Sequence, residues 1–205
     1  MAYDQLASSE SIKKTEEALT AKGYDAVTVD NGAAALEKIK SLIPKDASVM
    51  NGSSVTLEKI GFIDYLKADK HGWNNLHAGI VAEKDPAKQA SLRKQASLSE
   101  YYLGSVHAMA ENGEFVVASN SGSQLPHIVF TSPNLILVVG VQKIVPTLAE
   151  AMKRLEEYVV PLENEHMKSL YGMGTQLNKV VIFKGENAHI GRKVHVILVK
   201  EQLGF

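Results

Sequence analysis

The chain has 205 residues, with 22 Lys and Arg against 23 Asp and Glu, so its formal charge is −1. Hydrophobic residues make up 45% of it, and it contains no cysteine. This near-neutral charge, without a block of Lys or Arg, excludes a typical nucleic-acid partner. The lack of cysteine excludes an iron–sulfur cluster, a thiolate zinc site or a redox disulfide held by the chain itself.

The first five residues lack the basic and apolar leader of a secretory signal, and no apolar stretch approaches the ~20 residues that span a bilayer. A chain of this length buries roughly 70% of its unfolded surface, enough for one core without disulfides. We therefore expect a single domain over residues 1–205, located in the cytoplasm, with no membrane segment.

Helical and strand patterns alternate along the first half. A helix is expected over residues 9–22, capped by Ser8 or Ser9 and ended by Gly23, as an appendage to the sheet. Further segments follow in chain order: a strand at 24–29, a helix from Asn31 to Pro44, a strand at 47–50, a helix at 53–61 and a helix from Asp85-Pro86.

The second half is richer in strands. Residues 106–110 and 115–118 flank Asn112-Gly113, which predicts a hairpin with a type I′ turn. Residues 135–139 are all apolar, as in a strand buried on both faces, and Pro146 is expected to open a helix. Two more strands are expected at 180–183 and 194–199. The alternation predicts an α/β fold, a three-layer α/β/α domain whose sheet is mixed but mostly parallel.

The most informative segment is residues 48–58, which read Ser-Val-Met-Asn-Gly-Ser-Ser-Val-Thr-Leu-Glu. This is a strand, a glycine turn, a hydroxyl cluster and a helix start. Free amides at a helix start and adjacent hydroxyls bind anions, and ligands of α/β sheets settle beyond the carboxyl ends of strands. The segment therefore predicts an anion site formed by Asn51, Gly52, Ser53, Ser54 and Thr56. The alternative is that the serines only cap the helix.

Other polar turns could complete such a site. Residues 120–124 contain Asn120, Ser121, Gly122 and Ser123, and a later turn contains Gly174 and Thr175. Lys143 would supply a cation, although a surface lysine is the alternative. A carboxylate or phosphate pocket needs these turns to converge, which one sequence leaves open.

Several segments resemble the lactate-utilisation (LUD) domain family. Residues 51–61, Asn-Gly-Ser-Ser-Val-Thr-Leu-Glu-Lys-Ile-Gly, resemble its Ser-x-Thr-Leu-x-x-(Ile)-Gly signature, and residues 110–116 resemble its Ala-Glu-Thr-Gly-Thr hairpin. Residues 133–145 and 191–199 resemble its later strands. The matches occur in the family's order from about residue 48 to 200. Where the family often has Ala-Asp-Ala, this chain has Ser105-Val106-His107, and the late Thr-Ala-Asp element is not evident in residues 171–176.

The resemblance implies the fold shared by ribose-5-phosphate isomerase, glucosamine-6-phosphate deaminase and CoA transferases (NagB/RpiA/CoA transferase-like). It also implies a part in oxidising lactate to pyruvate beside iron–sulfur and redox subunits. Glu111, in Glu-Asn-Gly, resembles the short motif that carries the nucleophilic glutamate of class I CoA transferases, and a carboxylate there would attack an acyl-CoA. An exposed hairpin turn is the alternative reading. Glu58 is a second candidate catalytic residue, as a base.

The seven histidines do not show metal-ligand spacing. His71 and His77, like His189 and His195, are six residues apart, which suits neither a helix pair nor alternate strand positions. His127 follows Pro126 and is placed to face a pocket, without a partner nearby in sequence. We expect no metal and no cofactor.

Together these patterns favour an accessory protein of lactate or organic-acid oxidation that binds a small anionic metabolite. Two alternatives stay open: a CoA-transferase-like or sugar-phosphate isomerase-like enzyme, and a non-catalytic binding or scaffold protein. The sequence leaves open whether the chain forms a homo-oligomer.

Overall fold

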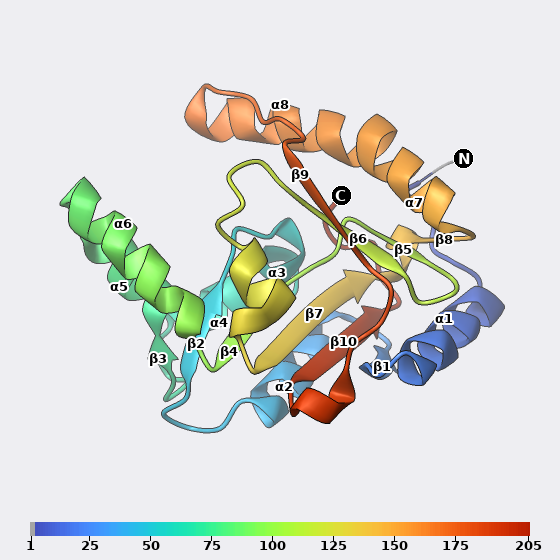
Figure 1. The fold of residues 1–205 in the computed structure, drawn as a ribbon, viewed down its shortest axis with the longest axis horizontal. Helices are drawn as coiled ribbons and strands as arrows, with labels where there is room; N and C mark the ends of the chain where they lie inside the picture. The colour runs from blue at the N-terminus through green and yellow to red at the C-terminus, as the bar shows by residue number, and fades with distance from the viewer. Residues whose placement is uncertain (1–2) are drawn as a thin grey trace.

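The computed structural model describes residues 3–205, except for the side chain of Ala188, and is built around a six-stranded sheet (Figure 1). The strand order is β1-β10-β7-β4-β2-β3, and every neighbouring pair is parallel. The strands are β1 (Asp25–Val29), β2 (Ser48–Asn51), β3 (Asn74–Asn75), β4 (Tyr101–Gly104), β7 (Asn134–Gly140) and β10 (Lys193–Val199). The expected α/β fold is confirmed.

A second sheet has the order β8-β5-β6-β9. Its strands are β5 (Ala108–Ala110), β6 (Phe115–Ser119), β8 (Ile144–Val145) and β9 (Lys179–Phe183). β6 is antiparallel to both β5 and β9, whereas β5 and β8 are parallel. The expected hairpin is therefore confirmed, and it belongs to this smaller sheet, so the six-stranded sheet stays wholly parallel.

The turn of this hairpin differs from the expected type I′. The amide of Gly113 donates to the Ala110 carbonyl at 2.9 Å, and the Ala110 amide donates to the Glu114 carbonyl at 2.7 Å. Only Gly113 has positive φ, at 82°, whereas a type I′ turn needs positive φ at both central residues. The prediction was wrong because the loop has three residues and closes with a glycine bulge.

Two hydrophobic cores fill the two faces of the parallel sheet. One face is covered by α2 (Gly32–Leu42), α3 (Val55–Lys59) and α4 (Phe62–Lys67). The other is covered by α1 (Ser9–Ala21), the short π-helical segment η2 (His127–Thr131) and the second sheet. The side chains of β7 alternate between the two cores, with Leu135, Leu137 and Val139 in one and Ile136 and Val138 in the other. A continuously apolar strand is thus explained by burial on both faces.

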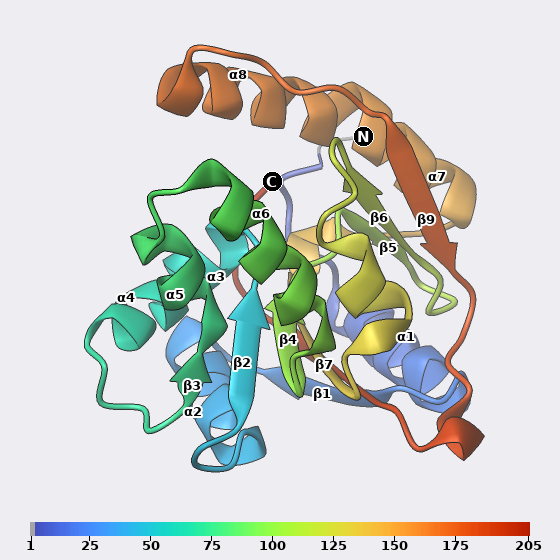
Figure 2. The same cartoon turned by 60° about the vertical axis from the view of Figure 1, so that its left-hand side comes forward.

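A long helical run covers the outer face of the second sheet and arches over the molecule (Figures 1 and 2). It consists of α7 (Leu148–Arg154), the π-helical segment η4 (Leu155–Val159) and α8 (Val160–Tyr171). Thr147 caps the run by accepting from the Glu150 amide at 3.2 Å. Pro146 therefore precedes the cap, which corrects the expectation that it begins the helix.

The remaining helices lie around the edges of the parallel sheet. α5 (Leu76–Ala82) packs beside β2, and α6 (Pro86–Gln95) follows it and leads into the 3₁₀ turn η1 (Ala96–Leu98). The other 3₁₀ turns are η3 (Val141–Lys143) and η5 (Ala188–Ile190). Within residues 3–205, no helix combines the length and apolar character needed to cross a membrane.

Helix starts follow the capping rules that the sequence suggested. Ser8, Asn31, Ser54 and Asp85 each cap a helix by accepting a hydrogen bond from an amide in its first turn. Each cap satisfies a donor that has no partner inside its helix. The predicted starts of these four helices are confirmed.

Candidate anion-binding site

A cavity of about 670 Å³ lies at the carboxyl ends of β2 and β4. Residues 51–56 end and follow β2, residues 104–107 end and follow β4, and Lys143 follows β7; all of them line the cavity. Its other walls come from α5, which lies beside β2, and from the η4–α8 run, which lies beyond the strand ends at the top of Figure 2. This is the edge at which ligands of parallel α/β sheets usually bind.

The structure brings the three polar turns of the sequence to this one cavity. The predicted site residues among its lining are Asn51, Gly52, Ser53, Ser54, Thr56, Asn120, Ser121, Ser123, Lys143 and Thr175. Gly122 and Gly174 belong to the same turns without lining the cavity. Gly122 has a φ of 87°, which shapes its turn.

The serine at the start of α3 has the capping role that was its alternative reading. Ser54 Oγ accepts from the Leu57 amide at 3.3 Å, so one amide of this turn is already used. α3 has only five residues, so its dipole is small. The side chains, more than the helix start, therefore define the chemistry of this wall.

Lys143 lies on the floor of the cavity and is 3% exposed. Its Nζ donates to Thr56 Oγ1, Ser105 Oγ and the Val106 carbonyl, each at 3.1 Å. No carboxylate pairs with it among the ion pairs of residues 3–205. Burial, with repulsion from Arg154 and Lys59, lowers the pKa of Lys143 to about 7.

The hydroxyl groups around Lys143 are oriented to accept from it. Thr56 Oγ1 donates to the Leu203 carbonyl at 3.2 Å, and Ser105 Oγ donates to the Val138 carbonyl at 2.6 Å. Each hydroxyl hydrogen is thus used elsewhere, which leaves its oxygen free to accept. Both hydroxyl oxygens on the cavity floor therefore accept hydrogen bonds from the Lys143 amine.

Gly204 closes the floor from the other side. It has a φ of 69°, and a Cβ there would lie 2.5 Å from Thr56 Oγ1 and 3.3 Å from Lys143 Nζ. Only glycine fits this backbone beside the lysine. The nearby Gln142 side chain donates to the Leu203 carbonyl at 2.9 Å and fixes the same segment.

His107 lies between two cations next to this floor. Its Nδ1 accepts from the Ala118 amide at 3.1 Å, and its own carbonyl accepts from Arg154 at 2.5 Å. Burial, with repulsion from Lys143 and Arg154, lowers the pKa of His107 to about 3. The imidazole is therefore neutral at physiological pH.

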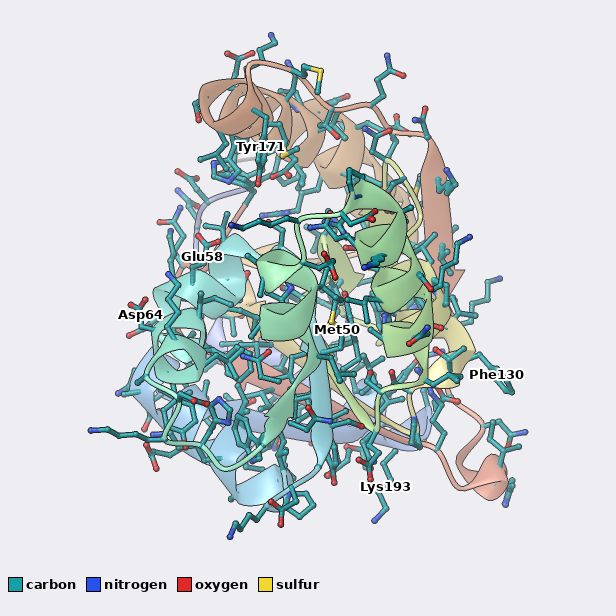
Figure 3. All side chains as sticks on the ribbon, turned by 90° about the vertical axis from the view of Figure 1, so that its left-hand side faces the viewer. Met50, Glu58, Asp64, Phe130, Tyr171 and Lys193 are labelled. Carbon is teal, nitrogen blue, oxygen red and sulfur yellow. The ribbon has the colours of Figure 1, made fainter. Side chains whose placement is uncertain are left out.

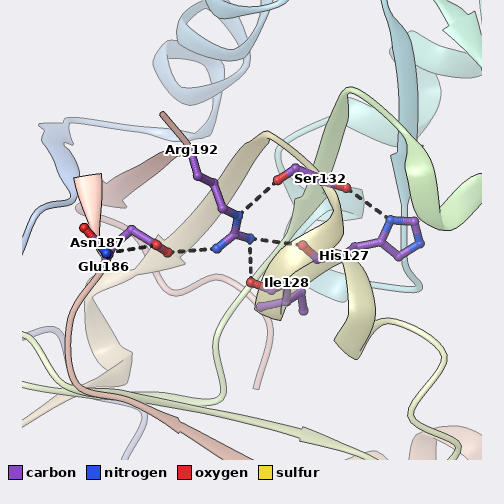
Figure 4. Close-up of polar contacts among 6 residues, drawn as sticks. All are labelled: His127, Ile128, Ser132, Glu186, Asn187 and Arg192. Carbon is purple, nitrogen blue, oxygen red and sulfur yellow. Dashed lines mark hydrogen bonds and ion pairs between the residues drawn. The ribbon is translucent and has the colours of Figure 1, made fainter. Parts of the chain in front are cut away.

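His127 lines the cavity, as its place after Pro126 suggested, and a network on its far side holds it there (Figure 4). Its ring stacks on Tyr102 with centroids 4.3 Å apart. Arg192 donates to the carbonyls of Ser132, His127 and Ile128 at 3.1, 3.0 and 2.6 Å, and pairs with Glu186 at 2.8 Å. Burial lowers the pKa of His127 to about 4.

The wall opposite the strand ends comes mainly from η4 and α8. Its side chains are Leu155, Val159, Val160, Glu163, His166, Met167 and Tyr171, with Phe205 beside them. Figure 3 shows Tyr171 on α8 and Met50 on β2, which contribute to opposite walls. Glu163 is the acidic side chain of the lining, and burial raises the pKa of its carboxyl group.

The two predicted catalytic glutamates lie outside the cavity lining. Glu58 is exposed on α3 and lies at the periphery in Figure 3. Glu111 accepts from Ser11 Oγ at 2.7 Å and from Lys14 Nζ at 2.8 Å, and these bonds lower the pKa of its carboxyl group. Their catalytic roles stay predictions, and the structure does not bring them to the cavity.

A second groove, of about 680 Å³, runs along α1 and β1. Its charged side chains have partners of their own: Lys13 lies 3.9 Å from Glu17, Lys200 lies 2.9 Å from Asp30, and Glu16 accepts from Thr28. It lacks the convergent strand ends and the unpaired buried cation of the first cavity. Within residues 3–205, no three His, Asp or Glu side chains are grouped to hold a metal ion.

Sequence reasoning missed several residues of the cavity, among them Ser105, His107, Glu163 and Gly204. Ser105 and His107 stand where the resembled family often has Ala-Asp-Ala, and that departure was their one sequence signal. Glu163 lies on α8, and Gly204 lies near the C-terminal end of the sequence; both are distant in sequence from the polar turns that predicted the site.

Comparison with known proteins identifies the family. The LUD domain pattern matches residues 12–199. The structure is similar to the crystal structure of a DUF162 family protein from Deinococcus radiodurans, with a TM-score of 0.58 and 11% identity over 95% of this chain and 99% of that one. This likeness supports the fold alone. No curated protein sequence matches the chain significantly. Because the family pattern covers most of its length, the chain belongs to the LUD domain family.

Proposed function

We propose that this LUD domain protein binds a small anionic metabolite, a carboxylate of the lactate and pyruvate type, in the cavity above Lys143. In this role it serves as an accessory component of lactate or related organic-acid utilisation. The observation that carries the proposal is the buried Lys143 side chain, whose Nζ has only neutral acceptors around it.

The electrostatic argument starts from the cost of burying a charge. A buried cation usually has a carboxylate partner, because desolvation without one costs several kcal/mol. Lys143 has no such partner in the part of the chain that the structure describes, and it lines an open cavity. An anionic ligand would supply the missing charge and would raise the pKa of Lys143 again.

The polar turns favour a ligand with several oxygen atoms. Ser53, Ser121 and Ser123 line the cavity with hydroxyl groups, and Asn120 adds an amide. These groups donate hydrogen bonds to carboxylate, carbonyl or phosphate oxygens. The charged side chains of the lining are two cations, Lys143 on the floor and Arg93 on α6, and one acid, Glu163 on α8, so a ligand of low negative charge fits best.

Composition and family membership both support the proposed accessory role. The chain holds no cysteine, so it cannot itself carry an iron–sulfur cluster. Electrons from lactate would pass through separate iron–sulfur and redox subunits, with this chain acting beside them. For the catalytic alternatives, neither Glu58 nor Glu111 lines the cavity, so no specific observation favours a CoA-transferase-like or isomerase-like reaction.

Binding is tested by thermal shift and calorimetry with L-lactate, pyruvate, inorganic phosphate, ribose 5-phosphate and CoA. We expect L-lactate or pyruvate to raise the melting temperature by several degrees near 100 times its Kd, since ligand binding then adds about 2.7 kcal/mol of stability. Lys143→Met should weaken this binding at least tenfold. The matched control is Lys193→Met: the Lys193 side chain is exposed outside the cavity, so this variant should bind as the unchanged chain does.

Equal binding by Lys143→Met and the unchanged chain would contradict the proposed site. The pathway role is tested separately in the host cell. Deletion of the encoding gene should slow growth on L-lactate and leave growth on glucose unchanged. Unchanged growth on L-lactate would remove the role in lactate utilisation while leaving the anion site intact.

A further inference from the structure

His107 is a cavity residue whose tautomer the backbone fixes. The Ala118 amide donates to Nδ1 at 3.1 Å, so in the neutral ring the single hydrogen resides on Nε2. Among residues 3–205, no hydrogen bond engages Nε2, and the ring lines the cavity. The side chain therefore offers a free N–H donor on the cavity side.

The surroundings keep this ring neutral. The charged groups that act on it are Lys143 and Arg154, both cations, and no carboxylate opposes them there. Arg154 is itself fully buried and holds the His107 carbonyl, while Lys143 donates to Ser105 and Val106, the two residues before it. The backbone of residues 105–107 is thus held by both cations.

We propose that His107 is a ligand-binding residue, which donates from Nε2 to an oxyanion or carbonyl oxygen of the ligand held above Lys143. This inference rests on the proposed function, because it requires an anion at Lys143. It narrows the ligand class to compounds that place a second accepting oxygen beside the charged group, as a 2-oxo acid does.

A neutral histidine is suited to this task. A cationic imidazole between Lys143 and Arg154 would be strongly destabilised, whereas the neutral ring donates without adding charge. The ring is oriented before any ligand arrives, because the Ala118 amide holds its Nδ1 and Arg154 fixes the backbone carbonyl of the same residue. Such preorganisation lowers the cost of binding.

The direct test is nitrogen-15 NMR of the histidine rings in the full chain. We expect His107 to show the Nε2–H tautomer at pH 7 and not to titrate between pH 5 and 8. Adding pyruvate should shift its Nε2 and attached-proton signals, and the same addition to Lys143→Met should not. A cationic ring, or an Nδ1–H tautomer, would overturn the inference.

Variants separate this inference from the proposed function. His107→Leu should weaken pyruvate binding about tenfold, the usual cost of losing one hydrogen bond to a charged group. His107→Gln, whose amide donates at a similar reach, should retain most of the affinity. His189→Leu is the control, because His189 is exposed outside the cavity lining.

The outcomes are distinct. Pyruvate that binds His107→Leu as tightly as the unchanged chain, while Lys143→Met fails to bind, overturns only the role of His107. The absence of any stabilising carboxylate overturns the proposed function and this inference together. If His107→Leu does not fold, its circular dichroism will show this. The role of His107 is then decided by the pyruvate affinity of His107→Gln relative to the unchanged chain and by the NMR shift of the His107 ring.

Discussion

Two basic side chains are buried at opposite ends of the parallel sheet, and they differ in whether a carboxylate pairs with them. Arg192 lies just before β10 and has Glu186 at 2.8 Å together with three backbone carbonyls. Lys143 lies just beyond β7 and has two hydroxyls and one carbonyl, with no carboxylate. The first charge is neutralised within the protein and binds two segments together. The second charge remains available to a ligand, which is why we place the site there.

The largest effect should come from breaking the Arg192 network. Arg192→Leu removes four hydrogen bonds and leaves the nearly buried Glu186 carboxylate without its partner. We expect the free energy of unfolding to fall by about 3–5 kcal/mol, the usual cost of breaking a buried pair. Urea denaturation measures it, with the exposed neighbour Lys193→Ala as control. A loss below about 1 kcal/mol would mean that the network contributes little.

The next effect concerns Lys143 and pH. Its pKa in the folded chain, about 7, lies below the ordinary lysine pKa of 10.5, so between these two values the unfolded chain binds more protons. The contribution of Lys143 to the free energy of unfolding must therefore rise as the pH increases above 7, by up to about 1.4 kcal/mol per pH unit. Urea titrations at pH 7, 8 and 9 should show a steeper rise for the unchanged chain than for Lys143→Met. Parallel slopes would place the lysine pKa outside this range.

A smaller effect on stability should distinguish the two serines at the start of α3, because Ser54 caps the helix and Ser53 is proposed to contact the ligand. Ser54→Ala loses the hydrogen bond from the Leu57 amide and should cost about 1 kcal/mol of stability. Ser53→Ala, at an exposed position without a capping bond, should leave stability unchanged and weaken carboxylate binding a few-fold. Urea denaturation and calorimetry on both variants decide. If Ser53→Ala binds normally, the hydroxyl does not touch the ligand.

The smallest effect is expected at Glu111. Its carboxylate is engaged with Ser11 and Lys14, and it lies outside the cavity lining. Glu111→Gln should therefore leave carboxylate binding unchanged and lower stability only slightly, since exposed ion pairs contribute little. Incubation with acyl-CoA donors followed by mass spectrometry provides the counter-test. A thioester on Glu111 would restore the CoA-transferase hypothesis.

Local signals in the sequence predicted much of the fold. Serine, asparagine and aspartate caps located helix starts, and the apolar run 135–139 identified a strand buried on both faces. β4 was missed because four residues carry too little periodicity to be recognised. The hairpin was found, yet its turn type was wrong, since Asn112 does not adopt positive φ.

The site was predictable only in part, because its residues are distant in the chain. Each polar turn was recognisable by its own composition, but their convergence depends on strand order. Lys143 meets Thr56 and Ser105 because β2, β4 and β7 are neighbours in the sheet. The neutral state of His107 depends on Arg154, which lies 47 positions later in the chain. No local pattern contains such information.

The position of β1 in the sheet also has a consequence for the order of folding. β1 pairs only with β10, so residues 25–29 find their sheet partner in residues 193–199. During synthesis from the N-terminus, β1 cannot pair in the sheet until β10, near the other end of the described chain, has been made. Contacts so distant in sequence slow folding and leave strand edges exposed to aggregation in the meantime. The strand made first is thus among the last to be secured.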